Sequence, residues 1–192
     1  ILISFQLTAQ TNKNFEALDV FQLEYANDPQ ISPDGNTIVY RRTGFDIMKD
    51  GSKGDLWLLS SDGRTHEKLT SRESNESRGR WSPSGDRIAF VSKGDHGSEI
   101  YVYWILSGAL AKLTQLENSP SSISWSPNGE SIAFTMKVNA KAPVIAKMPA
   151  KPKDAKWAKA PRITDRLKHE ADGAGYLKPG FTHIFTIPSE GG

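Results

Sequence analysis

The sequence predicts an all-β protein built from repeated units of four short strands, and two observations lead to this prediction. The first is a ten-residue phrase that occurs three times, at residues 31–40 (ISPDGNTIVY), 81–90 (WSPSGDRIAF) and 125–134 (WSPNGESIAF). Its serines stand at positions 32, 82 and 126, so the spacings are 50 and 44 residues. A period of about 40–50 residues is typical of propellers and other stacked arrays.

The second observation is that other elements repeat with the same period. Residues 56–59 (LWLL) return 44 residues later as 100–103 (IYVY), and residues 68–70 (KLT) return as 112–114 (KLT). A third copy of the first of these elements occurs at 183–188 (HIFTIP). Each unit therefore reads as four short runs in a constant order.

Each run has the composition of a β-strand. Proline and glycine in Ser-Pro-x-Gly favour a tight turn, because proline fixes φ and glycine tolerates a positive φ. The flanking runs are rich in β-branched and aromatic residues, which suit a half-buried pleated surface. The turns at 61–63 and 189–192 follow the same logic. Four antiparallel strands in about 44 residues make one propeller blade.

The repeats predict a partial β-propeller over residues 28–192, with blades at about 28–70, 78–114 and 121–192. The first two blades are complete, and the third lacks its last strand. Residues 11–27 form a lead-in with a short helix, since Phe15, Leu18 and Phe21 have roughly helical spacing and Pro29 ends the pattern. In the third blade an insertion of about 40 residues, at 137–182, separates the second strand from the third, and its second half is expected to form a hairpin over 160–182.

Repeat positions also predict the core. We expect Ile38, Ile88 and Ile132 to be buried between blades, because each follows its turn serine by six residues. Trp81 and Trp125 hold identical places in their repeats, which favours packing between blades over the alternative of a platform for a ligand.

Charge and composition narrow the choice of partners. The net charge is +2, but residues 137–178 carry 11 Lys/Arg against 4 Asp/Glu, a net of +7. Such a segment attracts nucleic acid or anionic membrane. We interpret it as a solvated loop, because alanine and proline interrupt its lysines and leave no basic amphipathic face. We therefore predict no nucleic-acid partner, and no run of residues is long and apolar enough for a membrane span.

The first ten residues are apolar and uncharged and have a small residue, Ala9, near their end. Residues 1–10 therefore fit the remnant of a signal peptide, with an edge strand as the alternative. The predicted location is periplasmic or secreted, and otherwise cytoplasmic. The sequence has no cysteine, so it forms no disulfides.

No set of residues predicts catalysis. The pentapeptide Gly-x-Ser-x-Gly of a nucleophile elbow does not occur. Residues 95–98 (DHGS) place Asp, His and Ser side by side, but triad partners meet by folding and this stretch is expected to be a turn. The histidines at 66, 96, 169 and 183 lack metal-ligand spacing, and the Gly-rich residues 172–175 are expected to form a hairpin turn, not a phosphate site. We predict no catalytic residue, metal or cofactor.

Arg41 and Arg42 are the candidate substrate-binding residues. Strand alternation turns one of them toward the neighbouring blade and the other outward. An arginine near the central channel could hold a peptide carboxylate through two hydrogen bonds. The alternative is a surface ion pair with a nearby acid.

The repeats and their flanks resemble the TolB-type, or WD40-like, propeller. Residues 18–35 before the first turn, and 157–164, 172–176 and 183–192 after the third, resemble the N-terminal propeller of prolyl oligopeptidase-family serine peptidases, particularly the acylaminoacyl-peptidase-like branch. The resemblance covers about residues 15–192. It implies a peptidase of short peptides, in which the propeller limits substrate access and a C-terminal α/β-hydrolase domain carries the catalytic triad.

We expect the chain to be a piece of that longer protein, since it has no initiator methionine and stops where earlier copies continue into Lys-Leu-Thr. By itself it is predicted to be inactive. The alternative is a TolB-like propeller that only binds proteins or peptides.

Overall fold

The computed structural model describes residues 14–192 except 73, 95, 142, 145, 147–148, 159–162 and 192. The predicted signal-peptide remnant at 1–10 lies outside these residues. The chain divides into two compact units, Ile1–Gly79 and Arg80–Gly192, and each is considered by itself.

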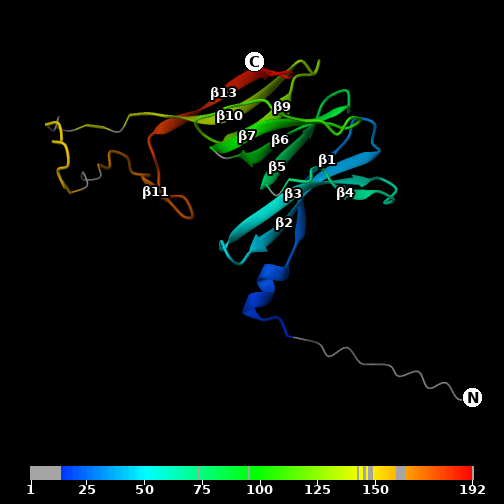
Figure 1. Ribbon diagram of the computed structural model, residues 1–192, viewed down its shortest axis with the longest axis horizontal. Helices are drawn as coiled ribbons and strands as arrows, with labels where there is room; N and C mark the ends of the chain where they lie inside the picture. The colour runs from blue at the N-terminus through cyan, green and yellow to red at the C-terminus, as the bar shows by residue number, and fades with distance from the viewer. Residues whose placement is uncertain are drawn as a thin grey trace, which may run out of the picture. The chain divides into compact units, whose positions relative to one another are not determined.

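The first unit holds a lead-in and one four-stranded antiparallel sheet (Figure 1). The predicted short helix is confirmed as a 3₁₀ helix, η1 (Ala17–Gln22). Sheet one has the order β1-β2-β3-β4 and consists of β1 (Tyr25–Ile31), β2 (Thr37–Asp46), β3 (Gly51–Ser60) and β4 (His66–Lys68).

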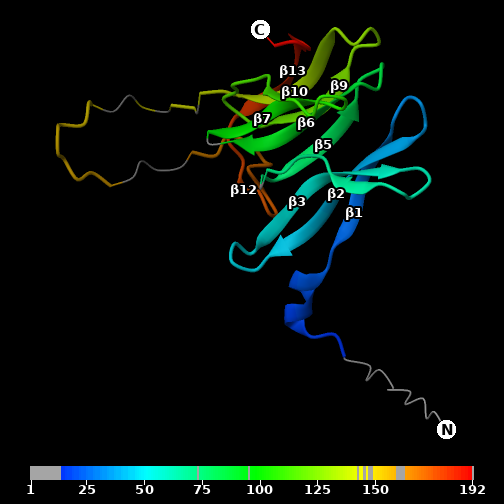
Figure 2. The same cartoon turned by 45° about the vertical axis from the view of Figure 1, so that its right-hand side comes forward.

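Two more sheets follow along the chain. Sheet two has the order β5-β6-β7-β8, with β5 (Glu76–Trp81), β6 (Arg87–Gly94), β7 (Gly97–Trp104) and β8 (Leu110–Lys112). Sheet three has three strands in the order β13-β10-β9, with β9 (Pro120–Trp125), β10 (Ser131–Asn139) and β13 (Gly180–Pro188). Figure 2 shows β9, β10 and β13 side by side. The all-β fold with two complete blades and one incomplete blade is therefore confirmed.

The long insertion leaves sheet three between β10 and β13. These strands pair continuously from Ser131↔Pro188 to Asn139↔Gly180, so both ends of the predicted insertion belong to the strands. Part of the predicted hairpin is present as β11 (Glu170–Ala171) and β12 (Gly175–Tyr176). The residues between them form the expected turn, with Gly173 at a φ of 69°.

The Ser-Pro-x-Gly turns are equivalent in all three sheets. The glycine N–H donates to the serine carbonyl at 2.9 Å in each, and the glycines have φ values of 77°, 75° and 72°. Each serine Oγ also accepts the N–H five residues later, at 2.9–3.1 Å, from Thr37, Arg87 and Ser131. Serine therefore recurs because its hydroxyl closes the turn that its backbone begins.

The core of the second unit lies between sheets two and three. It consists of Ala89, Val91, Ile100, Val102, Ile123, Ile132 and Phe134, and Trp125 packs against it. The predicted packing role of Trp125 is thus confirmed.

The prediction for the three isoleucines is correct for two of them. Ile88 and Ile132 have no exposed surface, but Ile38 is only half-buried, and its neighbour Val39 is fully buried. The reason is that successive side chains of a strand point to opposite faces, and in the first unit the face of Val39 is the covered one.

A left-handed residue recurs in the first strand of each of sheets one, two and three. Asp28, Arg78 and Ser122 have φ values of 50°, 60° and 51°, and each lies four residues before its turn serine. The pairing of β1 and of β9 shifts register at this point. Such a bulge re-aims the residues around it. Buried residues in β9 are accordingly three apart, at Pro120 and Ile123, where regular alternation would give two or four.

Candidate functional site

Arg41 is held inside the first unit by its own hydrogen bonds. Its Nε donates to the Glu76 carbonyl at 2.9 Å, Nη1 to Thr43 Oγ1 at 2.9 Å, and Nη2 to Asn75 Oδ1 at 2.8 Å. A Cβ at Gly54 would lie 2.7 Å from Arg41 Nε, so glycine leaves the space that the guanidinium fills. Arg41 therefore ties β2 to the segment that leads into β5.

Arg42 lies on the opposite face of β2, so the structure does not bring the two arginines together. Its guanidinium pairs with the Glu24 carboxylate of the lead-in and lies over the Trp57 ring, 5.0 Å from its centroid. The Arg42 side chain remains 40% exposed. The surface ion pair with a nearby acid, which was the alternative for these two arginines, is thus present at Arg42.

Two further side chains join Arg42 and Trp57 on this face. His66 Nε2 lies 2.6 Å from Tyr40 Oη, and the His66 ring lies 5.0 Å from the Trp57 ring. We call Tyr40, Arg42, Trp57 and His66 the aromatic–cationic patch. Aromatic faces and a partly exposed guanidinium can bind planar amides and carboxylates. Beyond Arg42, this patch could not be predicted from the sequence, because it depends on the register Tyr40↔Trp57 and Leu59↔His66.

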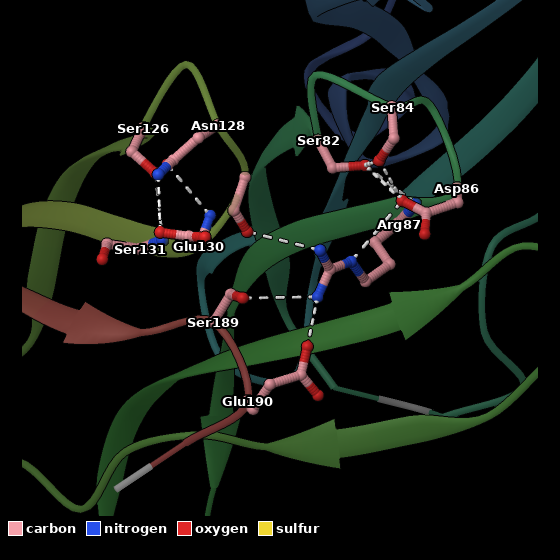
Figure 3. A network of polar contacts seen from close by, with 11 residues as sticks. Ser82, Ser84, Asp86, Arg87, Ser126, Asn128, Glu130, Ser131, Ser189 and Glu190 are labelled. Atoms are coloured by element: carbon pink, nitrogen blue, oxygen red, sulfur yellow. Dashed lines mark hydrogen bonds and ion pairs between the residues drawn. The ribbon is translucent and has the colours of Figure 1, made fainter.

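A second arginine site lies in the second unit, where Arg87 joins three segments (Figure 3). Its Nη1 donates to Glu190 Oε1 at 2.7 Å and to Ser189 Oγ at 3.3 Å, and its Nη2 donates to the Gly129 carbonyl at 3.3 Å. The guanidinium also lies over the Trp125 ring, 5.0 Å from its centroid. These partners occupy the guanidinium, and the Arg87 side chain is only 13% exposed. Arg87 therefore links segments of the second unit and is not available to bind a ligand.

The recurring Lys-Leu-Thr element ends each of the first two sheets with a buried threonine. Thr70 Oγ1 donates to Glu76 Oε1 at 2.5 Å, and Thr114 Oγ1 donates to Glu99 Oε2 at 2.7 Å. Both carboxylates are buried and also accept backbone N–H groups, from Leu56 for Glu76 and from Leu116 for Glu99. The threonine of the repeat therefore satisfies a buried carboxylate, which the sequence alone did not indicate.

Glu76 makes a contribution to stability that depends on pH. Burial raises its pKa above the ordinary value of 4.5, while the hydrogen bonds from Thr70 and the Leu56 N–H act in the opposite direction. Because the folded state holds this proton more tightly, the contribution of Glu76 to the free energy of unfolding is greatest below pH 4.5. It falls as the pH rises through the folded-state pKa.

We expect Glu76→Gln to remove this loss of stability. Glutamine has the same shape, and its amide can accept the Leu56 N–H while donating to Thr70 Oγ1. Thermal unfolding followed by circular dichroism should show the variant gaining stability relative to the wild type as the pH rises above 4.5. The exposed Glu67→Gln is the matched control and should follow the wild-type profile. A constant difference between Glu76→Gln and wild type at all pH values would contradict this account.

The turn aspartates behave in the opposite way. The Ser32 hydroxyl and then the Asn36 N–H lower the pKa of Asp34, and the Ser84 hydroxyl lowers that of Asp86. Both carboxylates are at the surface of their turns, where Asp34 accepts the Asn36 N–H and Asp86 accepts the Ser82 and Ser84 hydroxyls.

The described residues show no arrangement for catalysis. His96 lies in the turn before β7, and Asp95 is outside the described residues. Within the part of the chain that the structure covers, no three His, Cys, Asp or Glu side chains gather as metal ligands, and no helix there is long and apolar enough to cross a membrane.

Comparison with known sequences finds relatives among peptidases. Dipeptidyl-peptidase 5 of Porphyromonas gingivalis is 34% identical over 70 residues, which is 36% of this chain and 10% of that protein. The Uncharacterized peptidase YuxL of Bacillus subtilis is 28% identical over 92 residues, which is 47% of this chain and 14% of that protein. The chain thus spans only a small part of the length of these relatives.

Solved structures show the same fold. The acylaminoacyl peptidase of Pyrococcus horikoshii matches 88% of this chain with a TM-score of 0.64 at 17% identity, and the match covers 24% of that chain. An acylaminoacyl peptidase in complex with Z-Gly-Gly-Phe-chloromethyl ketone matches 89% with a TM-score of 0.65 at 18% identity, again over 24% of that chain.

The family comparison agrees with the repeats. Residues 10–158, more than half of the 192-residue chain, match the family described as PD40, TolB beta propeller domain. The resemblance indicated by the three Ser-Pro-x-Gly repeats and their flanks is confirmed. The chain belongs to the TolB β-propeller domain family.

Proposed function

We propose that this chain is the N-terminal propeller portion of a secreted or periplasmic serine peptidase of the prolyl oligopeptidase family. The observation that carries the proposal is its similarity to Dipeptidyl-peptidase 5, of which the chain spans 10%. The similarity to a second peptidase, over 14% of its length, supports it. In this proposal the catalytic serine, aspartate and histidine lie in a C-terminal α/β-hydrolase domain of the same polypeptide.

The role of the propeller is then that of a substrate-access filter. A rigid ring of blades over an active site admits short peptides and excludes folded proteins, which is specificity by rejection. The insertion between β10 and β13 shapes the face of the propeller that meets the hydrolase domain. Its Trp157, which is 46% exposed, and Phe181 at the start of β13, which is 65% exposed, give that face apolar area.

Of the two candidate arginines, Arg42 is the one that we propose for contact with substrate. Arg41 donates to three acceptors of the protein, whereas Arg42 is partly exposed within the aromatic–cationic patch. A peptide carboxylate would have to compete with Glu24 for its guanidinium, so Arg42 contributes to selection of substrates and not to tight binding.

A binding module without catalysis is the second candidate function. The aromatic–cationic patch favours it, because such a surface recognises peptides without any reacting group. The two functions differ in whether the complete polypeptide hydrolyses peptides.

We expect the purified chain alone to show no peptidase activity, because without an activated nucleophile the remaining groups have no reaction to promote. The measurement is release of nitroaniline from N-acylated and free-amino peptide nitroanilides, with buffer as the blank. The complete protein expressed from its own gene is the control, and it should turn over these substrates with sensitivity to serine-directed inhibitors. Inhibitor-sensitive turnover by the chain alone would overturn the proposal, and an inactive complete protein would favour the binding module.

A further inference from the structure

Asparagine is followed by glycine only once in the sequence, at Asn128 and Gly129 in the Ser-Pro-x-Gly turn of sheet three. Asparagine is among the residues that degrade spontaneously in proteins. The backbone nitrogen of the next residue attacks Cγ of the asparagine side chain, and glycine permits this approach because it has no Cβ. Asn128 is exposed, so water reaches its side chain. This turn therefore contains both reacting groups of one chemical modification, deamidation.

Deamidation changes the main chain and needs no reagent except water. The Gly129 nitrogen loses its proton and forms a bond to Asn128 Cγ, and the bond from Cγ to Nδ2 breaks and releases ammonia. Water then opens the resulting succinimide ring at either of its carbonyls. One opening gives aspartate at position 128. The other gives isoaspartate, which places an additional carbon in the main chain before Gly129.

Both reacting groups are held by hydrogen bonds of the folded turn (Figure 3). The Gly129 N–H donates to the Ser126 carbonyl at 2.9 Å. Asn128 Oδ1 accepts the Ser126 hydroxyl at 2.7 Å and the Glu130 N–H at 3.2 Å. Asn128 Nδ2 donates to Glu130 Oε2 at 2.6 Å. The closed turn disfavours the reaction, because its nitrogen keeps the proton in a hydrogen bond and its side chain is fixed away from the attacking geometry.

Arg87 of sheet two also holds this turn. Its Nη2 donates to the Gly129 carbonyl at 3.3 Å, although the two residues are 42 positions apart in the sequence. Gly129 is buried beside the turn of sheet two, where a Cβ would lie 3.7 Å from Pro83 Cδ and 3.8 Å from Arg87 Nη2. Rotation of the peptide group between Asn128 and Gly129 displaces Gly129 from these contacts. The Arg87 contact therefore opposes deamidation.

The equivalent turn of sheet one shows what the product would meet. Asp34 stands there at the position of Asn128, and its Oδ1 accepts the Ser32 hydroxyl at 2.5 Å and the Asn36 N–H at 3.1 Å. Its other oxygen faces an amide, since Asn36 Nδ2 donates to Asp34 Oδ2 at 3.0 Å. In sheet three the facing group is the Glu130 carboxylate. Aspartate at position 128 would thus keep two hydrogen bonds of the turn but face a like charge.

We propose that Asn128 is a deamidation site that its folded turn and the Arg87 contact protect, so that local opening of this turn sets the rate of modification. The reaction is irreversible and weakens the contact that protected the site. Isoaspartate lengthens the main chain before the Gly129 carbonyl that Arg87 binds, and aspartate is repelled by Glu130. The proposal holds whether or not the complete protein is a peptidase.

The test follows deamidation at Asn128 by mass spectrometry after the purified chain is incubated in mildly alkaline buffer. Trypsin releases residues 113–137 as one peptide, which also contains Asn118, followed by serine, as an internal control. A synthetic peptide of the same residues in the same buffer is the reference that lacks the folded turn. Arg87→Gln removes the contact with Gly129. Arg64→Gln is the matched control, because the Arg64 side chain is 87% exposed.

We expect Asn128 to deamidate at least about tenfold more slowly in the folded chain than in the peptide, because the turn must open before the Gly129 nitrogen attacks. In the peptide, Asn128 should react faster than Asn118. Arg87→Gln should raise the rate at Asn128 in the folded chain at least about threefold and speed hydrogen exchange of the Gly129 N–H, and Arg64→Gln should change neither.

Circular dichroism shows whether Arg87→Gln folds. If it does not, Ser126→Ala, which removes the hydroxyl bound to Asn128 Oδ1, takes its place and should give the same increase. Equal rates at Asn128 in the folded chain and in the peptide would overturn the proposal, and so would a folded variant that deamidates at the wild-type rate. The deamidated fraction, separated by anion exchange, should melt at a lower temperature than the unreacted chain, and equal melting temperatures would contradict the weakened contact.

Discussion

Ile88→Asp is expected to unfold the second unit of the protein at ordinary temperatures. Ile88 has no exposed surface. Its burial contributes about 1.5–3 kcal/mol, which the substitution removes. The aspartate in its place must also lose its hydration or its charge, so the total loss is expected to exceed about 4 kcal/mol, which is a large fraction of the stability of most domains. Loss of the cooperative thermal transition in circular dichroism is the measurement.

Ile38→Asp is the matched control, because it is the same substitution at the same position of the first repeat. Ile38 is half-buried, so its aspartate can keep much of its hydration, and the expected loss is about 1 kcal/mol. Equal losses of stability for Ile88→Asp and Ile38→Asp would contradict the difference in burial between these two positions. An unchanged melting temperature for Ile88→Asp would contradict the packing of sheet two altogether.

Gly79→Ile is the second substitution with a large expected effect. The Cβ alone would lie 3.2 Å from Leu56 Cδ1 and from Val39 Cγ2, and the rest of the side chain has no space. Overpacking of this kind costs about 1–3 kcal/mol or more. Gly79 does not have a positive φ, so the effect comes from space and not from backbone strain. Denaturant unfolding measures it.

A compensating variant separates overpacking from other causes. Val39→Ala/Gly79→Ile copies the pair Ala89 and Ile123, which packs well in the second unit. The double variant should be more stable than the sum of the single changes predicts, with a coupling of about 1–3 kcal/mol between the two sites. Gly79→Ala, with only one added carbon, should have a smaller effect than Gly79→Ile. Strict additivity of Val39→Ala and Gly79→Ile would show that the two positions do not share one space.

The candidate site was only partly visible in the sequence. Arg41 and Arg42 stand out as two adjacent positive residues. Because successive side chains of a strand point to opposite faces, they were expected on different faces of β2, as the structure has them. Their partners were not visible, because Glu76 and Asn75 are more than thirty residues from Arg41 and Glu24 is eighteen residues from Arg42. The aromatic–cationic patch depends on the register of three strands, and the function of the threonine in Lys-Leu-Thr depends on which carboxylate comes to lie beside it.

The sequence by itself determined the repeat, the four strands of each unit and the turns between them. These features are local: the Ser32 hydroxyl closes its turn with Thr37, Pro33 fixes its own φ, and Gly35 adopts the positive φ that the turn needs. Such interactions join residues at most a few positions apart, so each copy of the phrase forms the same structure.

Only the tertiary structure decided which face of each strand is buried. Ile38, Ile88 and Ile132 are identical in sequence position, yet one is half-buried, and Ile184 is exposed where Ile100 is buried. The left-handed residues Arg78 and Ser122 also shift the alternation, which period-two reasoning cannot anticipate. The physical reason is that burial belongs to the pair of surfaces that meet, and a repeat specifies only one of them.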